Sequence, residues 1–567
     1  MNRILPRLLE NWPVATIGLG LIIIVILFYG CESKPAVRID SQTRDANAAD
    51  ECSAQLMDGI SRVQPENLGV VGTTTNLAGS PQGAAETLSQ WLRRDDCQSA
   101  IPTRPVPEEA VALMKRLVGS DVAASLLDED MDAFNAADLR DAFLNFETAE
   151  NLSAGVTDDV QRVQKIFNYV VRVVSPEAQS SVELTHSGFE AELFGRGSAE
   201  ARAWLFANLL RQLRIDAVIL RPGRESAESD GPWWIGVPIR GDVYLFDARL
   251  GLPVPAPEAK FTGESPLPPP ATWGEVVASP ELLTDYRETA GLEVAPIDPA
   301  GLKPPRVELI GPRTYWKKAI ERLELSLREH RGVLLFDPLQ STAAGPGLYE
   351  RIVAAGQGLW PAEAIDVWKY PETYRRDRGE LLVTDEDARR QSRPRQERLD
   401  QRIAPLLGPV LVERERVRPQ VLPPNEMSRE GQESKKLWLT RIGQISRTGG
   451  GVISSLQQIV AEAISPDPTL PPRAHSLNRQ ASDEAAYWSG HAQYRAQAWD
   501  VALTTIENYI RNNGDRSGEA AALRVLVLAE QEKWEAAIKA ARELPETVPG
   551  RERFVYLADW WASAMKE

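Results

Sequence analysis

The stretch that most constrains the fold is residues 197–220, where an amphipathic helix pattern leads directly into an apolar strand pattern. On a helix, Leu205, Leu209 and Leu213 recur every four residues, and Phe206 and Leu210 lie beside them in one apolar stripe. The apolar run 217–220 follows after a short hinge and indicates a strand. Helix and strand patterns this close together predict a mixed α+β fold.

The flanking sequence extends this unit in both directions. Residues 158–174 have the periodicity of a strong helix, and residues 233–238 and 243–247 read as two strands joined at residues 240–242. Proline clusters at 253–257 and 266–270 end the unit. Residues 156–300 therefore form the best-defined domain that the sequence predicts.

This region resembles the core of the transglutaminase-like, papain-related family. The residues in register with the family pattern are Gly197, Ala203, Leu205, Phe206, Leu209, Arg211, Ile215 and Ala217. The resemblance implies helices packed on an antiparallel sheet, with a catalytic Cys, His and Asp. In this chain the three positions hold Ala199, Pro232 and Asp247. Because acyl transfer in this family needs a thiolate and an imidazole, the resemblance implies a domain without catalysis, in which Asp247 bonds backbone or caps a turn.

Two alternatives keep a site in this region. Ser198 lies next to the cysteine position and could act as a rebuilt nucleophile with His186 and Asp247, as in a serine-dependent hydrolase or acyltransferase. The other alternative is a ligand or peptide cleft; its lining would be the tryptophans near the helix and strands, Trp204, Trp233 and Trp234, which otherwise belong to the core.

No cofactor or metal motif accompanies these residues. The sequence lacks the phosphate-loop, HExxH and GxSxG patterns. An acidic run at 128–132 has Ala133 and Leu139 where a calcium loop needs Gly and Glu, so an acidic turn or a helix N-terminus is the better interpretation. We expect neither a cofactor nor a metal ion.

The N-terminus carries an apolar run at residues 13–30 that is just long enough to span a bilayer. Arg3 and Arg7 precede it, which favours a cytoplasmic N-terminus. A single uncleaved anchor is the first interpretation, and a lipoprotein signal ending at Cys31 or a conventional cleaved signal are the alternatives. All three place residues 32–567 outside the cytoplasm, so we expect a single-pass bacterial inner-membrane protein that is mostly periplasmic.

The cysteine count bears on disulfide formation, and the net charge limits the class of binding partner. Cys52 and Cys97 form an even pair, which in an oxidising compartment favours a disulfide over two buried thiols. The net charge of −16 argues against nucleic-acid binding, because phosphate backbones need a positive surface. The arginines between 389 and 402 alternate with acidic residues and predict a solvated charged helix or loop.

The C-terminal part contains an internal repeat. The pattern at 498–503 (AWDVAL) recurs at 533–538 (KWEAAI), an offset of 35 residues. This is close to the tetratricopeptide period, and Gly490, Ala502 and Ile506 occupy its small, small and bulky positions. The resemblance implies helical repeats over residues 481–567 that bind a protein or peptide partner.

The predicted organisation runs as follows: 1–31 membrane anchor or lipoprotein signal, 32–55 tether, 56–155 helical region, 156–300 degenerate transglutaminase-like domain, 301–435 α+β region of unknown type, 436–480 helices and Pro-rich linker, 481–567 tetratricopeptide-like repeats. From these parts we expect a membrane-tethered, non-catalytic scaffold of the cell envelope that binds proteins or peptides. The alternatives are the rebuilt hydrolase and a purely structural envelope protein.

Overall fold

The computed structural model describes most of the chain: residues 41–73, 79–98, 105–177, 184–223, 231–263, 265–294, 297–327, 332–342, 345–383, 385–407, 436–446, 450–464 and 472–564. The chain divides into two units, Met1–Cys52 and Ser53–Glu567. Helix α2 (Ser41–Arg62) begins in the first. The predicted membrane segment at 13–30 and Cys31 lie outside the described residues. No described helix combines the length and apolar composition that crossing a bilayer requires.

The first half of the second unit is a set of helices, and several of them begin where the sequence supplies a capping side chain. Asp132, Asp158, Ser187 and Ser198 accept backbone N–H groups at the starts of α7, α8, α9 and α10, as such residues do at helix N-termini. The helices are α3 (Pro81–Leu92), α4 (Asp95–Gln98), α5 (Glu108–Val118), α6 (Ser120–Leu127), α7 (Ala133–Ser153), α8 (Asp159–Val173), α9 (Gly188–Phe194) and α10 (Ala199–Gln212). The predicted acidic helix start near 128–132 is therefore confirmed at Asp132.

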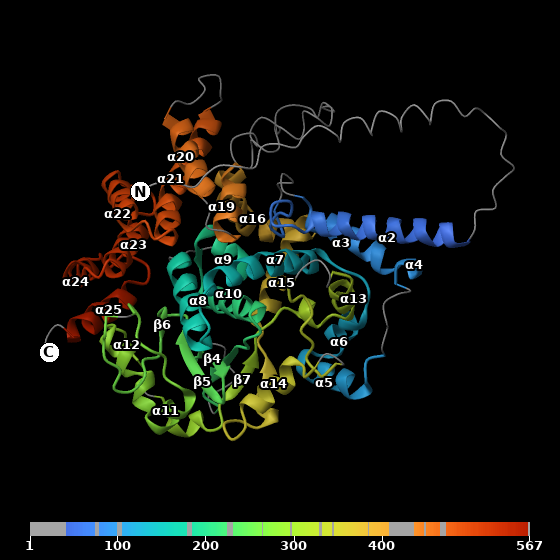
Figure 1. The fold of residues 1–567 in the computed structure, drawn as a ribbon, viewed down its shortest axis with the longest axis horizontal. Helices are drawn as coiled ribbons and strands as arrows, with labels where there is room; N and C mark the ends of the chain where they lie inside the picture. The colour runs from blue at the N-terminus through green and yellow to red at the C-terminus, as the bar shows by residue number, and fades with distance from the viewer. Residues whose placement is uncertain are drawn as a thin grey trace, which may run out of the picture. The chain divides into compact units, whose positions relative to one another are not determined.

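A six-stranded sheet follows, with strand order β6-β5-β4-β3-β7-β8 (Figure 1). Its strands are β3 (Val218–Arg221), β4 (Trp234–Ile239), β5 (Asp242–Asp247), β6 (Leu252–Pro253), β7 (Arg306–Leu309) and β8 (Ile365–Val367). Neighbouring strands are antiparallel except β7 and β8, which are parallel. The predicted α+β class is confirmed, and strands β3 to β6 pair antiparallel as expected for residues 156–300. The parallel edge comes from β8, which lies outside that range. A separate short parallel pair joins β1 (Ser175–Pro176) to β2 (Arg196–Gly197).

The buried centre of this unit is α10. It packs against α7, α8 and α9, and its residues from Ala201 to Gln212 are all buried. An aromatic cluster joins it to the sheet, because Phe206 of α10 meets Phe246 of β5 at 5.4 Å and Phe167 of α8 at 5.3 Å between ring centroids. Offset aromatic contacts of this kind add to the burial of apolar area. The stripe that the sequence predicted is thus the core of the unit.

The predicted boundary at residue 300 does not separate two folding units, since β7 pairs with β3 along four residues and extends the same sheet. The elements around and beyond this boundary are α11 (Trp273–Ala278), η1 (Pro280–Leu283), α12 (Asp285–Thr289), η2 (Pro299–Leu302), η3 (Arg313–Trp316), α13 (Lys318–Leu327), α14 (Leu348–Ala355), η4 (Ala362–Ala364), α15 (Tyr370–Leu382) and α16 (Glu386–Leu407). The charged stretch with arginines 389–402 lies in α16. The sequence predicted either a solvated helix or a loop there, and the helix is the one formed.

Two local predictions from the sequence are wrong in this region: the apolar run 332–336 (GVLLF) predicts a strand, and residues 362–368 predict a helix. Residues 332–336 were expected to form a strand, yet the backbone N–H of Leu334 donates to Gln212 Oε1, and those of Leu335 and Phe336 donate to Glu324 Oε2. Side-chain acceptors thereby replace a partner strand. Residues 362–368 were expected to be helical, but after the short turn η4 they form β8, because β7 offers its edge.

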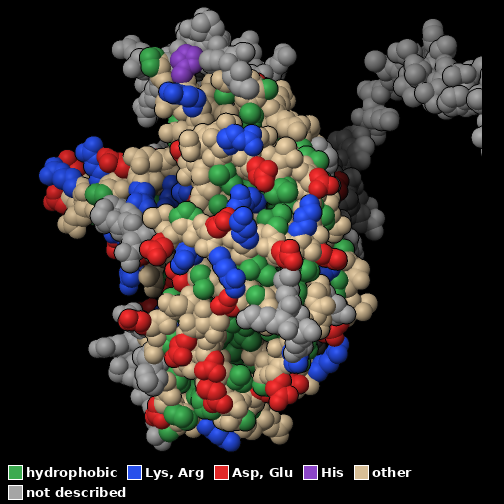
Figure 2. Space-filling view, turned by 90° about the vertical axis from the view of Figure 1, so that its left-hand side faces the viewer, with side chains coloured by type: hydrophobic (Ala, Val, Ile, Leu, Met, Phe, Trp, Pro, Cys, Tyr) green, Lys and Arg blue, Asp and Glu red, His purple; other side chains and the backbone are tan. Residues whose placement is uncertain are grey.

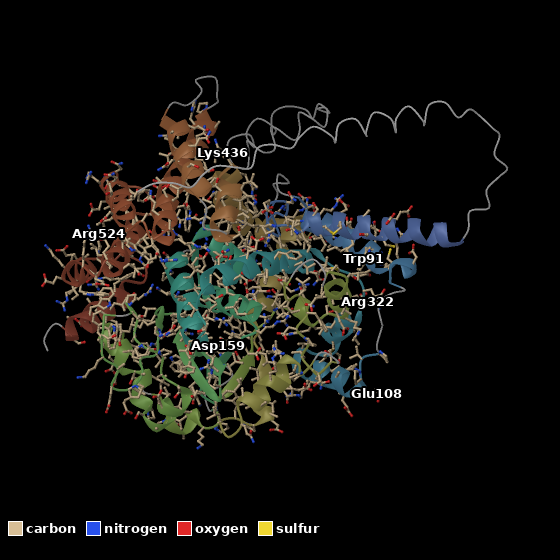
Figure 3. All side chains as sticks on the ribbon, viewed as in Figure 1. Trp91, Glu108, Asp159, Arg322, Lys436 and Arg524 are labelled. Carbon is tan, nitrogen blue, oxygen red and sulfur yellow. The ribbon has the colours of Figure 1, made fainter. Side chains whose placement is uncertain are left out.

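The C-terminal part is an all-α array. It comprises α19 (Lys436–Ser446), α20 (Gly450–Ile464), α21 (Pro472–Arg495), α22 (Trp499–Arg511), α23 (Ser517–Glu530), α24 (Trp534–Arg542) and α25 (Arg551–Ala564). From α19 onward each helix packs on the next, and α21 to α25 lie at the left in Figure 1, beside α8, β6 and α12. In Figure 3, Arg524 marks α23 and Lys436 marks the start of α19.

Candidate functional site

The N-terminus of α10 holds the position where the resemblance places the nucleophile. Ala199 is the first helical residue, and Ser198 is the N-cap whose hydroxyl accepts the N–H of Ala201 at 3.2 Å. Tyr370 donates its phenolic proton to the backbone oxygen of His186 at 3.1 Å. The Ser198 hydroxyl, 3.2 Å from the Tyr370 oxygen, is therefore the donor of that contact. The hydroxyl of Ser198 thus accepts one structural hydrogen bond and donates another.

Both carboxylate oxygens of Asp247 also have structural hydrogen-bond partners. It is 1% exposed, and its Oδ1 accepts the backbone N–H groups of Arg249 at 2.8 Å and Leu250 at 3.0 Å. Its Oδ2 accepts the hydroxyl of Tyr286 at 2.7 Å. Tyr286 in turn accepts the indole N–H of Trp234 at 3.2 Å. The carboxylate caps the turn after β5, which is the role that the sequence assigned to it.

Two arginines connect the region around Ala199, Pro232 and Asp247. Arg202, in the first turn of α10, donates to the backbone oxygen of Ala248 at 3.1 Å. Arg249 donates to the backbone oxygen of Gly231 at 3.3 Å. Ala248 and Arg249 follow Asp247 in sequence and Gly231 precedes Pro232, so the helix start, the strand end and the segment before β4 lie around one end of the sheet.

Aromatic side chains that sequence reasoning missed cover this end. Trp368, from the segment between β8 and α15, lies 6.3 Å from Trp233 and stacks on Tyr370 at 5.2 Å between ring centroids. Tyr370 also meets Trp204 edge-on at 6.1 Å. The three tryptophans proposed for a cleft are nearly inaccessible: Trp204 and Trp233 are 2% exposed and Trp234 is 0% exposed. They act as core residues in this structure.

No local signal in the sequence identifies Trp368 and Tyr370 as covering residues. Their position depends on the pairing of β8 with β7, which brings together parts of the chain separated by roughly sixty residues. Trp204 also lines a cavity of about 10 Å³ with Tyr374 and Arg375, a volume that suits at most a single water molecule.

His186 belongs to a buried ionic network and not to a Ser198 dyad. Its Nε2 lies 2.8 Å from a guanidinium nitrogen of Arg402 and 3.4 Å from Glu177 Oε2. Its Nδ1 lies 3.2 Å from Glu190 Oε2 and 3.5 Å from a guanidinium nitrogen of Arg378. Both ring nitrogens are occupied, and the contacts that connect His186 to Ser198 run through its backbone oxygen and Tyr370.

Two carboxyls of this network, those of Glu190 and Glu177, have lowered pKa values in the folded state. Burial by itself would raise the pKa of Glu190, but Arg378 and His186 outweigh it and lower that pKa to about 2. Arg378 pairs with Glu190 directly, and Glu177, which pairs with Arg398 and Arg402, also has its pKa lowered to about 2 against the effect of burial. The charged pairs join α9 to α15 and the residue after β1 to α16, so the network is structural.

A second set of buried carboxyls behaves in the opposite way. Burial raises the pKa of Asp138 from 3.8 to about 7, although Arg375 and Thr314 act against it. Burial also raises the pKa of Asp141 to about 6 and that of Glu192 to about 7. Asp138 accepts the hydroxyl of Thr314 from η3, which joins α7 to the segment after β7.

We expect Asp138 to make the protein less stable as the pH rises. Between about pH 4 and pH 7 the folded state keeps a proton that the unfolded state has lost, so the free energy of unfolding falls across this window, by about 4 kcal/mol at most for a shift of this size. Asp138→Asn removes this titration. Urea unfolding at pH 5 and pH 8 should show the variant gaining stability relative to the parent as the pH rises; parallel pH profiles would contradict the assignment.

The two copies of the predicted C-terminal repeat have the same backbone conformation at the turn between their helices. Gln497 and Glu532, 35 residues apart, both adopt positive φ, 58° and 57°. The following residues, Ala498 and Lys533, each donate back at 3.0 Å to the residue five positions earlier. A non-glycine residue in this conformation is uncommon, so the same special turn at both places shows that the two helix pairs are built alike.

Small residues let these helices approach closely. A Cβ at Gly490 of α21 would lie 2.8 Å from Ile506 Cγ1 of α22, and Ala502 and Ala537 are 0% exposed. Gly490, Ala502 and Ile506 thus take the packing roles that the sequence pattern predicted. The contacts are those of a helical hairpin stack and do not by themselves identify a repeat family.

One side of the array is occupied by the rest of the chain. Arg516, the residue before α23, donates to the backbone oxygen of Phe194 at 2.7 Å, and Arg553 of α25 donates to that of Val171 at 3.2 Å. The indole N–H of Trp561 donates to the backbone oxygen of Pro266 at 2.9 Å. These bonds bind α23 and α25 to α8, α9 and the loop after β6, which limits the surface that the array can offer to a partner.

The two cysteines of the described residues, Cys52 and Cys97, are each disulfide-bonded. Neither therefore offers a free thiolate as a nucleophile or as a metal ligand. Comparison of the chain with protein-family models, curated proteins and solved structures finds no match in any of the three. The class that the fold defines is a mixed α+β unit closely joined to a helical array.

Proposed function

We propose that this chain is a non-catalytic binding scaffold of the bacterial cell envelope, with a degenerate transglutaminase-like core and tetratricopeptide-like repeats. One observation carries the proposal: at the end of the sheet where the family would place its catalytic residues, the polar groups present already have structural partners. Ser198 caps α10, Asp247 caps the turn after β5, and aromatic side chains cover the surface between them. An acyl-transfer site needs an accessible nucleophile bonded to a base, and the described residues bring no such pair together here.

The tether rests on the apolar run at 13–30 with Arg3 and Arg7 before it. The binding role rests on the array, since helical repeats present extended surfaces to other proteins. The charge of −16 favours protein partners over nucleic acid. A rebuilt serine hydrolase is the competing function, and the experiment below separates the two.

Membranes from cells that express the full chain, washed with alkaline carbonate, should retain the protein, because a spanning segment resists extraction while a peripheral protein does not. The same membranes are then treated with a fluorophosphonate probe and a thioester substrate, with Ser198→Ala as the matched control. We expect no labelling and no turnover in either sample. Labelling that disappears in Ser198→Ala would overturn the non-catalytic assignment, and extraction by carbonate would overturn the anchor.

A further inference from the structure

A small cavity lies where the helical array meets the α+β body. Its walls come from β1, α8 and α10 on one side and from α23 and α25 on the other. The cavity has a volume of about 30 Å³, which leaves room for roughly two water molecules or one ion of similar size. We call it the α10–α25 cavity. Because its walls belong to both parts of the chain, an occupant contacts both.

Three of the residues that line the α10–α25 cavity are arginines, namely Arg172 of α8, Arg202 of α10 and Arg553 of α25. Arg202 and Arg553 are each 4% exposed. The hydrogen bonds that these two donate go to uncharged oxygens, which belong to Val174, Ala248, Val171 and Asn168. Such oxygens satisfy N–H groups but carry no full negative charge, and a buried cation is costly without one.

Carboxylates do not balance this positive charge. None of the three arginines forms an ion pair with a residue that the structure describes. Glu519 is the acidic residue of the lining, and it already accepts from Arg196 Nε at 2.8 Å. Asp247 acts on Arg202 from beyond ion-pair distance, and both of its oxygens hold other hydrogen-bond donors. The lining therefore carries an excess of positive charge.

The electrostatics of the three arginines show the same imbalance. Burial, together with the charge of Arg553, lowers the pKa of Arg202 to about 9. Burial also lowers the pKa of Arg553 to about 10, with Tyr494 opposing the shift and Arg172 adding to it. Arg172 lies 4.1 Å from the ring centroid of Tyr494, and the Nε atoms of Arg172 and Arg553 are buried without a partner among the described residues. An anion beside these groups would favour their charged forms.

The outer face of the array does not show such an excess. That face is turned toward the viewer in Figure 2, where the Lys and Arg side chains that are drawn in colour are interspersed with acidic ones. Salt screens exposed charges of mixed sign, so we expect only weak, non-saturating effects of anions there. A response to dilute anions would therefore come from the buried arginines.

We propose that the α10–α25 cavity binds one small inorganic anion of the size of chloride, which supplies the counter-charge for Arg202, Arg553 and Arg172. The cavity is too small for a tetrahedral oxyanion such as sulfate, whose five heavy atoms need more than the space of about two water molecules. Since Arg202 belongs to α10 and Arg553 to α25, the bound anion joins the body to the array. This site goes beyond the proposed scaffold function and does not depend on it.

The test is thermal unfolding of the full chain in a neutral detergent, with sodium chloride replacing sodium gluconate at constant ionic strength. The Tm of the parent should rise by roughly 1 to 2 °C and level off at millimolar chloride, because a ligand of the folded state alone stabilises it by mass action. In Arg553→Met this saturating rise should be lost. Arg511→Gln removes a positive charge from an exposed position of α22 outside the cavity lining, and it should respond like the parent.

Glu519→Gln tests the site in the opposite direction and does not depend on how well Arg553→Met folds. It removes the negative charge of the lining, so half-saturation should need roughly threefold less chloride. A parent Tm without a saturating response, an equal response of Arg553→Met, a lost response in Arg511→Gln, an unchanged half-saturation in Glu519→Gln, or a saturating response to sulfate would each overturn the anion site. Fluorophosphonate labelling of Ser198 would instead overturn the scaffold proposal and leave the anion site standing.

Discussion

Replacing Arg441 with alanine is expected to lower the free energy of unfolding by about 3 kcal/mol, because several buried contacts with a charged donor are lost together. Arg441 lies on α19 and is 1% exposed. Its guanidinium donates to the backbone oxygens of Glu192 at 2.7 Å and Leu193 at 3.3 Å. Those carbonyls belong to the last turn of α9, where a helix leaves its acceptors without internal partners.

The same guanidinium lies 3.3 Å above the ring centroid of Trp488 on α21, a cation–π contact in a water-free site. One side chain thus joins α9, α19 and α21. Truncation leaves two buried carbonyl oxygens unpaired and a cavity beside the indole, and both effects act in the same direction. The loss should appear as a lower urea midpoint, with the array and the α+β body unfolding together.

Arg390→Ala on α16 is the matched control. Arg390 is 72% exposed on its side chain and pairs with Glu386 one turn away, so its removal should change stability by about 0.5 kcal/mol or less. Equal effects of the two substitutions would show that Arg441 does not fasten the array to the body.

Gly188→Ala is expected to destabilise the core by about 2 kcal/mol or more, because the added methyl group meets a backbone that cannot move aside. A Cβ at Gly188, the first residue of α9, would lie 2.9 Å from Cα and 3.0 Å from N of Leu205 in α10. Relief requires α9 to move away from α10, which would disturb the ion pairs of Glu190 and His186 in the following turn. Thermal unfolding should report this as a fall in Tm of several degrees.

Gly379→Ala is the matched control, and here the same substitution is expected to increase stability. Gly379 lies inside α15, and a Cβ there meets no atom within 4 Å. Alanine loses less backbone entropy than glycine in a helix, so this variant should be more stable by about 0.5 to 1 kcal/mol. A Gly188→Ala protein as stable as the parent would show that α9 and α10 do not cross as closely as the structure places them.

Local patterns predicted the elements whose character depends on neighbouring residues. The leucine stripe of 205–213 gave α10, the periodicity of 158–174 gave α8 (Asp159–Val173), and the alternation at 233–247 gave β4 and β5 almost to the residue. The repeat at 498 and 533 predicted two helices that do begin at equivalent tryptophans, Trp499 and Trp534. Side-chain periodicity follows from backbone geometry, so it is written in the sequence itself.

Predictions of secondary structure from the sequence were wrong where a distant segment determined the hydrogen bonding of the backbone. Residues 332–336 have the composition of a strand, but Gln212 and Glu324 satisfy their N–H groups. Residues 365–367 looked helical and became β8 because β7 was available as a partner. Tertiary pairing outweighs a short segment's own preference, because an unpaired backbone group costs more than propensity differences do.

For the candidate site, the resemblance to the transglutaminase-like family predicts that Ala199 and Pro232 stand in place of a catalytic Cys and His. Only the tertiary structure decided which distant segments surround this region. It placed Trp368 and Tyr370 beside Trp233 and Ser198 and turned one side of the array toward the body. The contacts of Tyr370 with Ser198 and of Arg516 with Phe194 join residues 172 and 322 positions apart, and their energies depend on burial and geometry that no local pattern encodes.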